Sequence, residues 1–247
     1  MTNWWVPAKL VARVHQRLVL AVLLLPLVGL LAACGATAGP SASARPVPPA
    51  PKHCRAGSTQ VGSGRVAVAA VVVKRATAYR HPARRPFAQF GRLNQNHFPT
   101  VFRVVSAIRR SDCKTTWYRV QLPIKPNGVK GYVRARDVTV GQVRTRIVVQ
   151  VSQRRLTLFR RGRPVLHTTI AVGSRATPTP TGSYYVNQRL VPTDTVENAE
   201  MPIAIHGTNE PWSIGRAVSN GCIRVRNPVL RKLFASTPAG TPVVILR

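Results

Sequence analysis

The sequence predicts a mainly β protein with one short helix near its C-terminus. Residues 61–141 and 144–247 consist of short runs rich in β-branched and aromatic side chains, separated by turn residues, which is typical of strands. Residues 227–237 are the one convincing stretch of helical apolar spacing after the N-terminal segment. A length of 247 residues allows two small domains or one large one, and the two β regions favour two.

The first β region, residues 61–141, carries strand signals but no group of residues that suggests catalysis. An Asn-Gly pair within 125–128 is the strongest short signal for a hairpin turn. Two small β domains, or one sheet shared with the C-terminal part, are alternatives to a single domain. The expected strands are 66–73, 100–108, 117–124 and 131–138.

The second β region, residues 144–247, has sharper signals. Residues 146–173 are typical of three strands with polar breaks between them, and 241–247 of a closing strand. Residues 188–200 are polar and lack periodicity, so we expect a long loop there. The apolar run that follows is typical of a buried strand, and it ends in His206.

The helix expected at 227–237 has recognisable start signals. Asn227 is suited to cap it, and Pro228 to occupy the first helical position, where its missing N–H breaks no helical hydrogen bond. Four apolar side chains form the expected buried face: Val229, Leu230, Leu233 and Phe234.

The N-terminus has the order of a secretory signal. Lys9, Arg13 and Arg17 precede an apolar run at 18–33, which at 16 residues is short for a membrane span of about 20 residues. The small residues that end the run complete the pattern. We therefore expect export rather than a spanning helix.

The end of that signal, Leu-Ala-Ala-Cys at 31–34, resembles the lipobox of bacterial lipoproteins. The resemblance implies that 1–33 is removed and that Cys34 is lipidated, with 34–60 as an Ala-, Pro- and Ser-rich spacer. The mature protein would then be anchored to the outer face of the cytoplasmic membrane. An ordinary signal with an incidental cysteine is the alternative.

The charge balance is strongly basic, with 37 Lys and Arg against 6 Asp and Glu, a formal charge of +31. Such a balance first suggests a nucleic-acid partner. For an exported chain we instead expect anionic cell-wall polymers and the membrane surface, and no nucleic acid. A solvated basic surface without a partner is the alternative.

Three cysteines remain after Cys34, which is an odd number in an oxidising compartment. Sequence alone permits three pairings. Cys54 and Cys113 flank the first β region, and Cys222 lies more than a hundred residues further on, so we favour a Cys54–Cys113 disulfide and a free Cys222. A free thiol in an exported protein is most simply explained by reactivity.

His206 and Cys222 have the residue types of a nucleophile and its base. An ordinary cysteine is a few per cent thiolate at neutral pH, so a nearby histidine is needed to activate it. Ser219, Asn220 and Gly221 precede the cysteine in a small polar turn, where the N–H groups of Gly221 and Cys222 could stabilise an oxyanion. A metal site is weakly indicated because no paired Cys or His spacing accompanies these residues.

The stretch "HGTNEPWSIGRAVSNGCIRVRN" resembles the signature of L,D-transpeptidases with the YkuD-like catalytic domain. The resemblance extends over 145–247 and implies a β-sandwich or barrel. It implies that Cys222 is the acylated nucleophile, that His206 is the general base, and that the Gly207 carbonyl orients the imidazole. It further implies no cofactor and a substrate-binding role for Arg224, and we expect no metal. We also expect Asn209 and Trp212 to line the site, with a packing role as the alternative for Trp212.

One position departs from that signature. The family usually carries a second histidine where this chain has Asn220. An amide donates hydrogen bonds but does not titrate near neutral pH. Because the resemblance assigns the base to His206, we expect an active enzyme with Asn220 in a supporting role.

The stretch "WYRVQLPIKPNGVKGYVRARDV" resembles the end of bacterial Src-homology-3-like domains, which implies a small β-barrel at 61–141. Together the resemblances imply a transpeptidase that acts on peptidoglycan stem peptides. It would release D-alanine from a tetrapeptide stem, form 3→3 cross-links and be inhibited by carbapenem-type β-lactams, with L,D-carboxypeptidase activity as a possible side reaction. The alternative is a non-catalytic wall-binding lipoprotein or scaffold.

Overall fold

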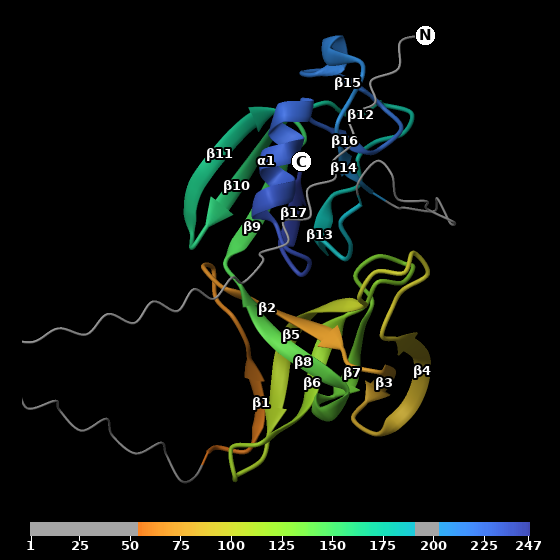
Figure 1. Ribbon diagram of the computed structural model, residues 1–247, viewed down its shortest axis with the longest axis vertical. Helices are drawn as coiled ribbons and strands as arrows, with labels where there is room; N and C mark the ends of the chain where they lie inside the picture. Colours follow the sequence, from red (N-terminus) through yellow and green to blue (C-terminus); the bar gives the residue numbers. More distant parts are fainter. Residues whose placement is uncertain (1–53, 191–202) are drawn as a thin grey trace, which may run out of the picture. The chain divides into compact units, whose positions relative to one another are not determined.

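The computed structural model describes residues 54–190 and 203–247 (Figure 1). The expected signal peptide, the lipidation site Cys34 and most of the expected loop 188–200 lie outside the described residues. The described part is mainly β with one α-helix. Within that part, no helix has the length and apolar character needed to cross a membrane.

The N-terminal part forms one antiparallel sheet of eight strands, in the order β4-β3-β7-β6-β5-β2-β8, with β1 paired to β5. It is separate from the C-terminal sheet, which excludes the alternative of one shared sheet. The elements are β1 (Gly57–Gln60), β2 (Ala67–Val72), β3 (Arg75–His81), β4 (Arg84–Gly91), β5 (Val101–Arg109), β6 (Thr115–Gln121), β7 (Lys130–Arg134), the 3-10 helix η1 (Ala135–Asp137) and β8 (Val138–Val143).

The four strands expected in this part correspond to β2, β5, β6 and β7. The Asn-Gly turn lies in the β6–β7 connection, where Gly128 has φ of 90°, and the two strands pair antiparallel as expected. The assignment of the spacer up to residue 60 was wrong at its end, because Gly57–Gln60 forms β1. All four of its residues are exposed, so pairing with β5, not an apolar pattern, makes it a strand. The Src-homology-3-like classification stays a prediction.

A disulfide joins Cys54 to Cys113, the pairing favoured by the sequence. It fastens the start of the described chain to the turn between β5 and β6, where the Cys54 N–H also donates to the Ser111 carbonyl. Cys222 is the free cysteine of the described residues.

The C-terminal part is built on a five-stranded sheet in the order β11-β10-β9-β17-β13. β17 runs parallel to β9, and the other neighbours are antiparallel. Two small parallel sheets, β12–β15 and β14–β16, carry the connections. The elements are β9 (Thr145–Gln150), β10 (Arg155–Arg160), β11 (Arg163–Thr169), β12 (Val172–Gly173), β13 (Gly182–Tyr185), β14 (Ile205–His206), the 3-10 helix η2 (Pro211–Ser213), β15 (Ala217–Ser219), β16 (Ile223–Arg224), α1 (Asn227–Ser236) and β17 (Pro242–Leu246).

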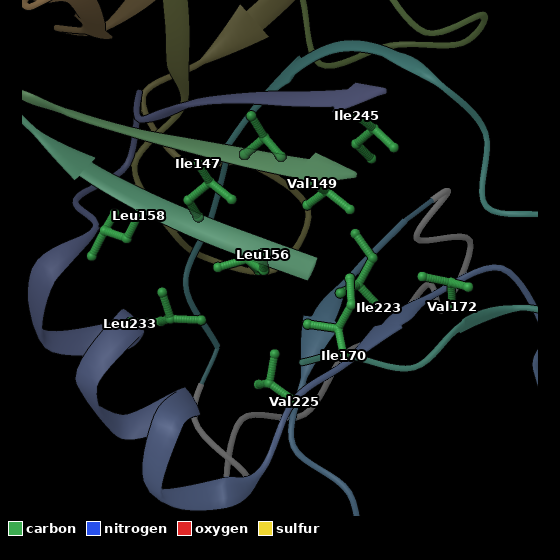
Figure 2. Packing of buried hydrophobic residues seen from close by; sticks show 11 residues of the cluster. Ile147, Val149, Leu156, Leu158, Ile170, Val172, Ile223, Val225, Leu233 and Ile245 are labelled. Carbon is green, nitrogen blue, oxygen red and sulfur yellow. The ribbon is translucent and has the colours of Figure 1, made fainter. Parts of the chain in front are cut away.

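One apolar core holds this part together. In β9, side chains alternate between buried and half-buried, so Ile147 and Val149 enter the core from one face of the sheet. Figure 2 shows Leu233 of α1 packing on the same cluster. Fully burying an aliphatic side chain stabilises a fold by roughly 1.5–3 kcal/mol. The other buried members are Leu156, Leu158, Ile170, Val172, Ile223, Val225, Val243 and Ile245.

Helix α1 begins one residue earlier than the capping signals suggested. Arg226 is the N-cap residue, with an extended backbone, so Asn227 is the first helical residue and Pro228 the second. The capping role expected of Asn227 was therefore wrong, because its side chain is used in another contact. Phe234 also differs from the expectation: it lies under the Arg189 guanidinium, 4.0 Å from the ring centroid, rather than in the buried cluster.

Candidate active site

Two short parallel strands bring the expected nucleophile and base together. In the β14–β16 pair, His206 lies opposite Arg224. The Ile223 N–H donates to the Ala204 carbonyl and the Val225 N–H to the His206 carbonyl, both at 2.9 Å. Cys222 directly precedes β16, so this ladder sets its position beside His206.

The imidazole of His206 is held in one orientation. Its Nδ1 lies 2.7 Å from the Gly207 carbonyl oxygen. A carbonyl only accepts, so Nδ1 carries the hydrogen and Nε2 remains for the thiol. The thiol of Cys222 is half-buried and hydrogen-bonded to this ring. This is the contact that the resemblance implied for the Gly207 carbonyl.

The hydrogen bond between the two side chains shifts both pKa values toward the charged pair. The bond to Cys222 raises the pKa of His206, burial opposes the shift, and the Gly207 carbonyl supports it. The bond to His206 lowers the pKa of the Cys222 thiol, burial opposes this, and the Ala204 N–H supports it. The arrangement thus favours a thiolate facing an imidazolium.

The turn before Cys222 is held by its own serine. The Ser219 hydroxyl donates to the Cys222 carbonyl at 2.6 Å and accepts from the Gly221 N–H at 3.3 Å. Gly221 has φ of 106°, a backbone conformation that L side chains rarely adopt. The Gly221 N–H expected in an oxyanion hole therefore has a long internal hydrogen bond in this structure. Asn220 is exposed at the tip of the turn.

Two threonines that the sequence did not identify fix this turn from a neighbouring loop. The Thr179 hydroxyl donates to the Gly221 carbonyl at 2.9 Å and accepts from the Gly173 N–H at 2.8 Å. The Thr177 hydroxyl donates to the Ser219 carbonyl at 3.0 Å. Thr179 is buried, so no water replaces its bonds. Thr179 is therefore a positioning residue for the Cys222 turn.

Replacing Thr179 by valine is expected to destabilise the protein and to slow reactions at Cys222. Valine has the same shape but leaves the Gly221 carbonyl and Gly173 N–H unpaired, at about 1 to 3 kcal/mol for each buried group. We expect a lower chemical-denaturation midpoint and slower alkylation of Cys222 by iodoacetamide. Thr179→Ser keeps the hydroxyl and is the control. Equal behaviour of the valine and serine variants would contradict the assignment.

The backbone that follows His206 is anchored to the start of helix α1. The Asn227 Oδ1 accepts a hydrogen bond from the Thr208 N–H at 2.9 Å. A Cβ added at Gly207 would lie 2.1 Å from the same oxygen, so a larger residue there would displace the Asn227 side chain from its contact with Thr208. The Asn227 side chain thereby fixes the backbone whose carbonyl orients His206.

Arg224 faces the same site and has an acidic partner. Its guanidinium forms an ion pair with Glu210, and its charge favours the thiolate of Cys222. Glu210 was not identified from the sequence, although it is one of only six acidic residues in a chain with 37 basic ones. Asn209 and Trp212, on either side of Glu210 in the loop, are exposed, Trp212 to 57%. Their substrate-binding roles stay predictions.

The sequence match extends over the whole C-terminal part. Residues 144–245 match the family model YkuD, described as the L,D-transpeptidase catalytic domain. The C-terminal part of the chain is therefore similar to the YkuD-like L,D-transpeptidase catalytic domain.

Individual relatives are similar to the same part of the chain. The YkuD L,D-transpeptidase of Bacillus subtilis (strain 168) is 39% identical over 107 residues, which cover 41% of this chain and 65% of the relative. That of Bacillus licheniformis is 41% identical over 106 residues, 40% of this chain and 64% of the relative. The chain thus spans slightly less than two thirds of these relatives. The solved catalytic domain of an Enterococcus faecium L,D-transpeptidase is 24% identical, with a TM-score of 0.33, over 41% of this chain and 96% of that domain.

The titratable groups that meet at the candidate site are suited to covalent chemistry. Within 54–190 and 203–247, no cluster of three His, Cys, Asp or Glu side chains could hold a metal ion. The groups that meet at the candidate site are a thiol, an imidazole and an ion-paired guanidinium. This combination can form and break a thioester.

Proposed function

We propose that the protein is a peptidoglycan L,D-transpeptidase that uses Cys222 as its nucleophile. The observation that carries the proposal is the hydrogen-bonded Cys222–His206 pair, with the imidazole held by the Gly207 carbonyl. A thiolate is a strong nucleophile, and a histidine oriented by a third group is the usual activating base. The pair lies within the residues that match the L,D-transpeptidase domain.

In the first half-reaction the Cys222 sulfur attacks the carbonyl of the third residue of a tetrapeptide stem. A thioester bond forms and the peptide bond to the terminal D-alanine breaks. The leaving amine takes a proton from the imidazolium of His206, so that ring returns to the neutral form. The Cys222 N–H stabilises the oxyanion, and the Gly221 N–H joins it when the long bond to Ser219 is exchanged for substrate.

In the second half-reaction an amine of another stem attacks the thioester. Neutral His206 accepts the amine proton, and the thiolate of Cys222 leaves, which restores the free enzyme. The product is a 3→3 cross-link. Water in place of the amine would give L,D-carboxypeptidase activity, and an amine on another protein would give anchoring.

Arg224 and Asn220 support this chemistry without taking a proton. The Arg224 charge lowers the pKa of the thiol, and its ion pair with Glu210 fixes the guanidinium beside the site. Asn220 is exposed next to Gly221, where an amide can position substrate. The base is His206 alone.

The setting proposed for this reaction is the outer face of the cytoplasmic membrane. The support is the lipobox-like sequence ending in Cys34 and the charge of +31, which suits anionic wall polymers and lipids. The N-terminal sheet would dock on the wall or on the catalytic domain. A non-catalytic wall-binding scaffold is the alternative.

Mass spectrometry of the full chain tests the proposal against the scaffold alternative. Incubation with a carbapenem is expected to give one covalent adduct, located on the peptide that contains Cys222. Incubation with a tetrapeptide stem is expected to release D-alanine and, with an amine acceptor present, to give a cross-linked dimer. An unmodified Cys222 and intact stems would support the scaffold and reject the enzyme.

A further inference from the structure

A second group of polar side chains lies in an open pocket of about 500 Å³ on the C-terminal part of the chain. It contains two guanidinium groups, an imidazole and two hydroxyls, and no acid: Arg155, Arg226, His167, Thr168 and Thr169, with Ile214 as the remaining lining residue. Among the described residues, the recorded ion pairs of arginines involve Arg110, Arg136 and Arg224. The two guanidiniums of the pocket therefore have no carboxylate partner in this part of the chain.

Two backbone pairings bring the pocket residues together. Arg155 of β10 lies opposite Thr169 of β11. Close by, Ala171 bridges Arg224 in antiparallel register, which brings the segment after β11 alongside the segment that leads to Arg226. Arg155, Thr169 and Arg226 line the same pocket, so their side chains converge there.

Arg226 lies on the face that carries the catalytic residues. Ile170, Ile223 and Val225 point into the apolar core (Figure 2). The alternate positions, Arg224 and Arg226, therefore face outward on the side of Cys222. At about 3.3 Å per extended residue, Arg226 lies about 7 Å beyond Arg224 and about 13 Å beyond Cys222.

The intervening cation is already neutralised. Arg224 is held by Glu210, the one acidic side chain recorded beside the described site residues. Arg155 and Arg226, in contrast, have no carboxylate partner among the described residues and remain available to an anion. Two arginines with an adjacent hydroxyl suit a carboxylate, which accepts two hydrogen bonds from one guanidinium.

We propose that the pocket of Arg155, Thr169 and Arg226 binds a carboxylate of the peptide that reacts at Cys222. The proposal rests on the proposed transpeptidase function. His167 has its Nδ1 3.1 Å from the Thr157 hydroxyl, which leaves Nε2 to the pocket as an additional contact. A separation of about 13 Å corresponds to about four extended residues, or to two residues and a long side chain. The pocket residues would then fix which carbonyl of the peptide lies at Cys222, in addition to attracting its negative charge.

Steady-state kinetics with paired substrates test the proposal. The full chain and its Arg155→Gln/Arg226→Gln variant are given a stem peptide with free carboxylates and the same peptide with those carboxylates amidated. The control, Arg163→Gln/Arg231→Gln, removes the same charge from exposed positions outside the pocket. Iodoacetamide alkylation checks that Cys222 keeps its reactivity in every variant.

The pocket variant is expected to raise KM for the free-acid peptide tenfold or more, with kcat within about twofold, because charge-assisted hydrogen bonds are lost. The amidated peptide should be insensitive to the substitutions, and the control should resemble the parent. Equal losses on both peptides, or equal losses in the control, would overturn the proposal.

A binding measurement separates this proposal from the proposed function. In a Cys222→Ala background, calorimetry measures the affinity for the free-acid peptide without turnover. The affinity therefore tests the pocket even if no acyl transfer is detected. Weaker binding after the Arg155 and Arg226 substitutions is expected. If those substitutions weaken binding of a soluble polyphosphate but leave peptide binding unchanged, the pocket serves phosphate polymers and the carboxylate assignment fails.

Discussion

A Cys222→Ala protein is expected to release no D-alanine from a tetrapeptide stem and to gain no mass from a carbapenem. Removal of a covalent nucleophile typically costs about 10⁶-fold in kcat, which is below detection in a discontinuous assay. The alternative nucleophile, water, lacks the position that Ser219 and Thr179 give the sulfur through the turn. Chromatography of released D-alanine, with intact-mass measurement, gives both readouts.

The fold should tolerate this change, so loss of activity is interpretable. Cys222 is half-buried and outside the apolar core cluster, and alanine retains its Cβ. An unchanged thermal midpoint and circular dichroism spectrum are the control. D-alanine release at the parental rate from Cys222→Ala would show that the chemistry does not pass through this sulfur.

Replacing His206 by glutamine should lower kcat/KM by about 10² to 10⁴. Glutamine keeps a hydrogen-bonding side chain but neither accepts nor returns a proton. The Cys222 pKa should rise toward its ordinary range, since the hydrogen bond to His206 is the main cause that lowers it. Alkylation rates measured against pH test this directly, and a variant whose thiol titrates as in the parent would contradict it.

The direction in which activity changes with pH follows from the pKa shifts of Cys222 and His206. The Cys222 pKa is lowered and the His206 pKa is raised, and both shifts favour the thiolate–imidazolium pair. Activity should rise with pH at values where an ordinary cysteine is still protonated. It should fall only where the imidazolium deprotonates, above the ordinary range of histidine. In His206→Gln the alkaline limb should disappear and the acidic limb should move to higher pH.

Several longer strands were predictable because they are rich in β-branched and other apolar residues, as β2, β5 and β9 are. β3 and β4 are as long but were not predicted, because arginine, alanine and a proline interrupt their β-branched and aromatic residues. β1 and the strands of two or three residues carry no apolar pattern. They exist because tertiary pairing supplies their hydrogen bonds, as in β1 on β5. A strand of two residues is too short to show an alternation of apolar and polar side chains.

The residues of the candidate site also fall into those that the sequence predicted and those that only the fold identifies. Cys222 and His206 were predictable because the motif joins them within one short stretch. Thr179 and Asn227 act on backbone groups 42 and 19 positions away, and such contacts depend on how the chain folds back. Glu210 lay inside the quoted motif, and only its ion pair with Arg224 shows what it does.

The two-residue strands β14 and β16 have a consequence for how the loop between them can vary. His206 and Cys222 are aligned by backbone hydrogen bonds, Ile223 to Ala204 and Val225 to His206. The length of the loop between them therefore does not by itself set their separation. Exposed side chains of this loop, such as Asn209 and Trp212, can change while the two site residues keep their positions. Residues that would contact a substrate can thus vary separately from the Cys222–His206 pair.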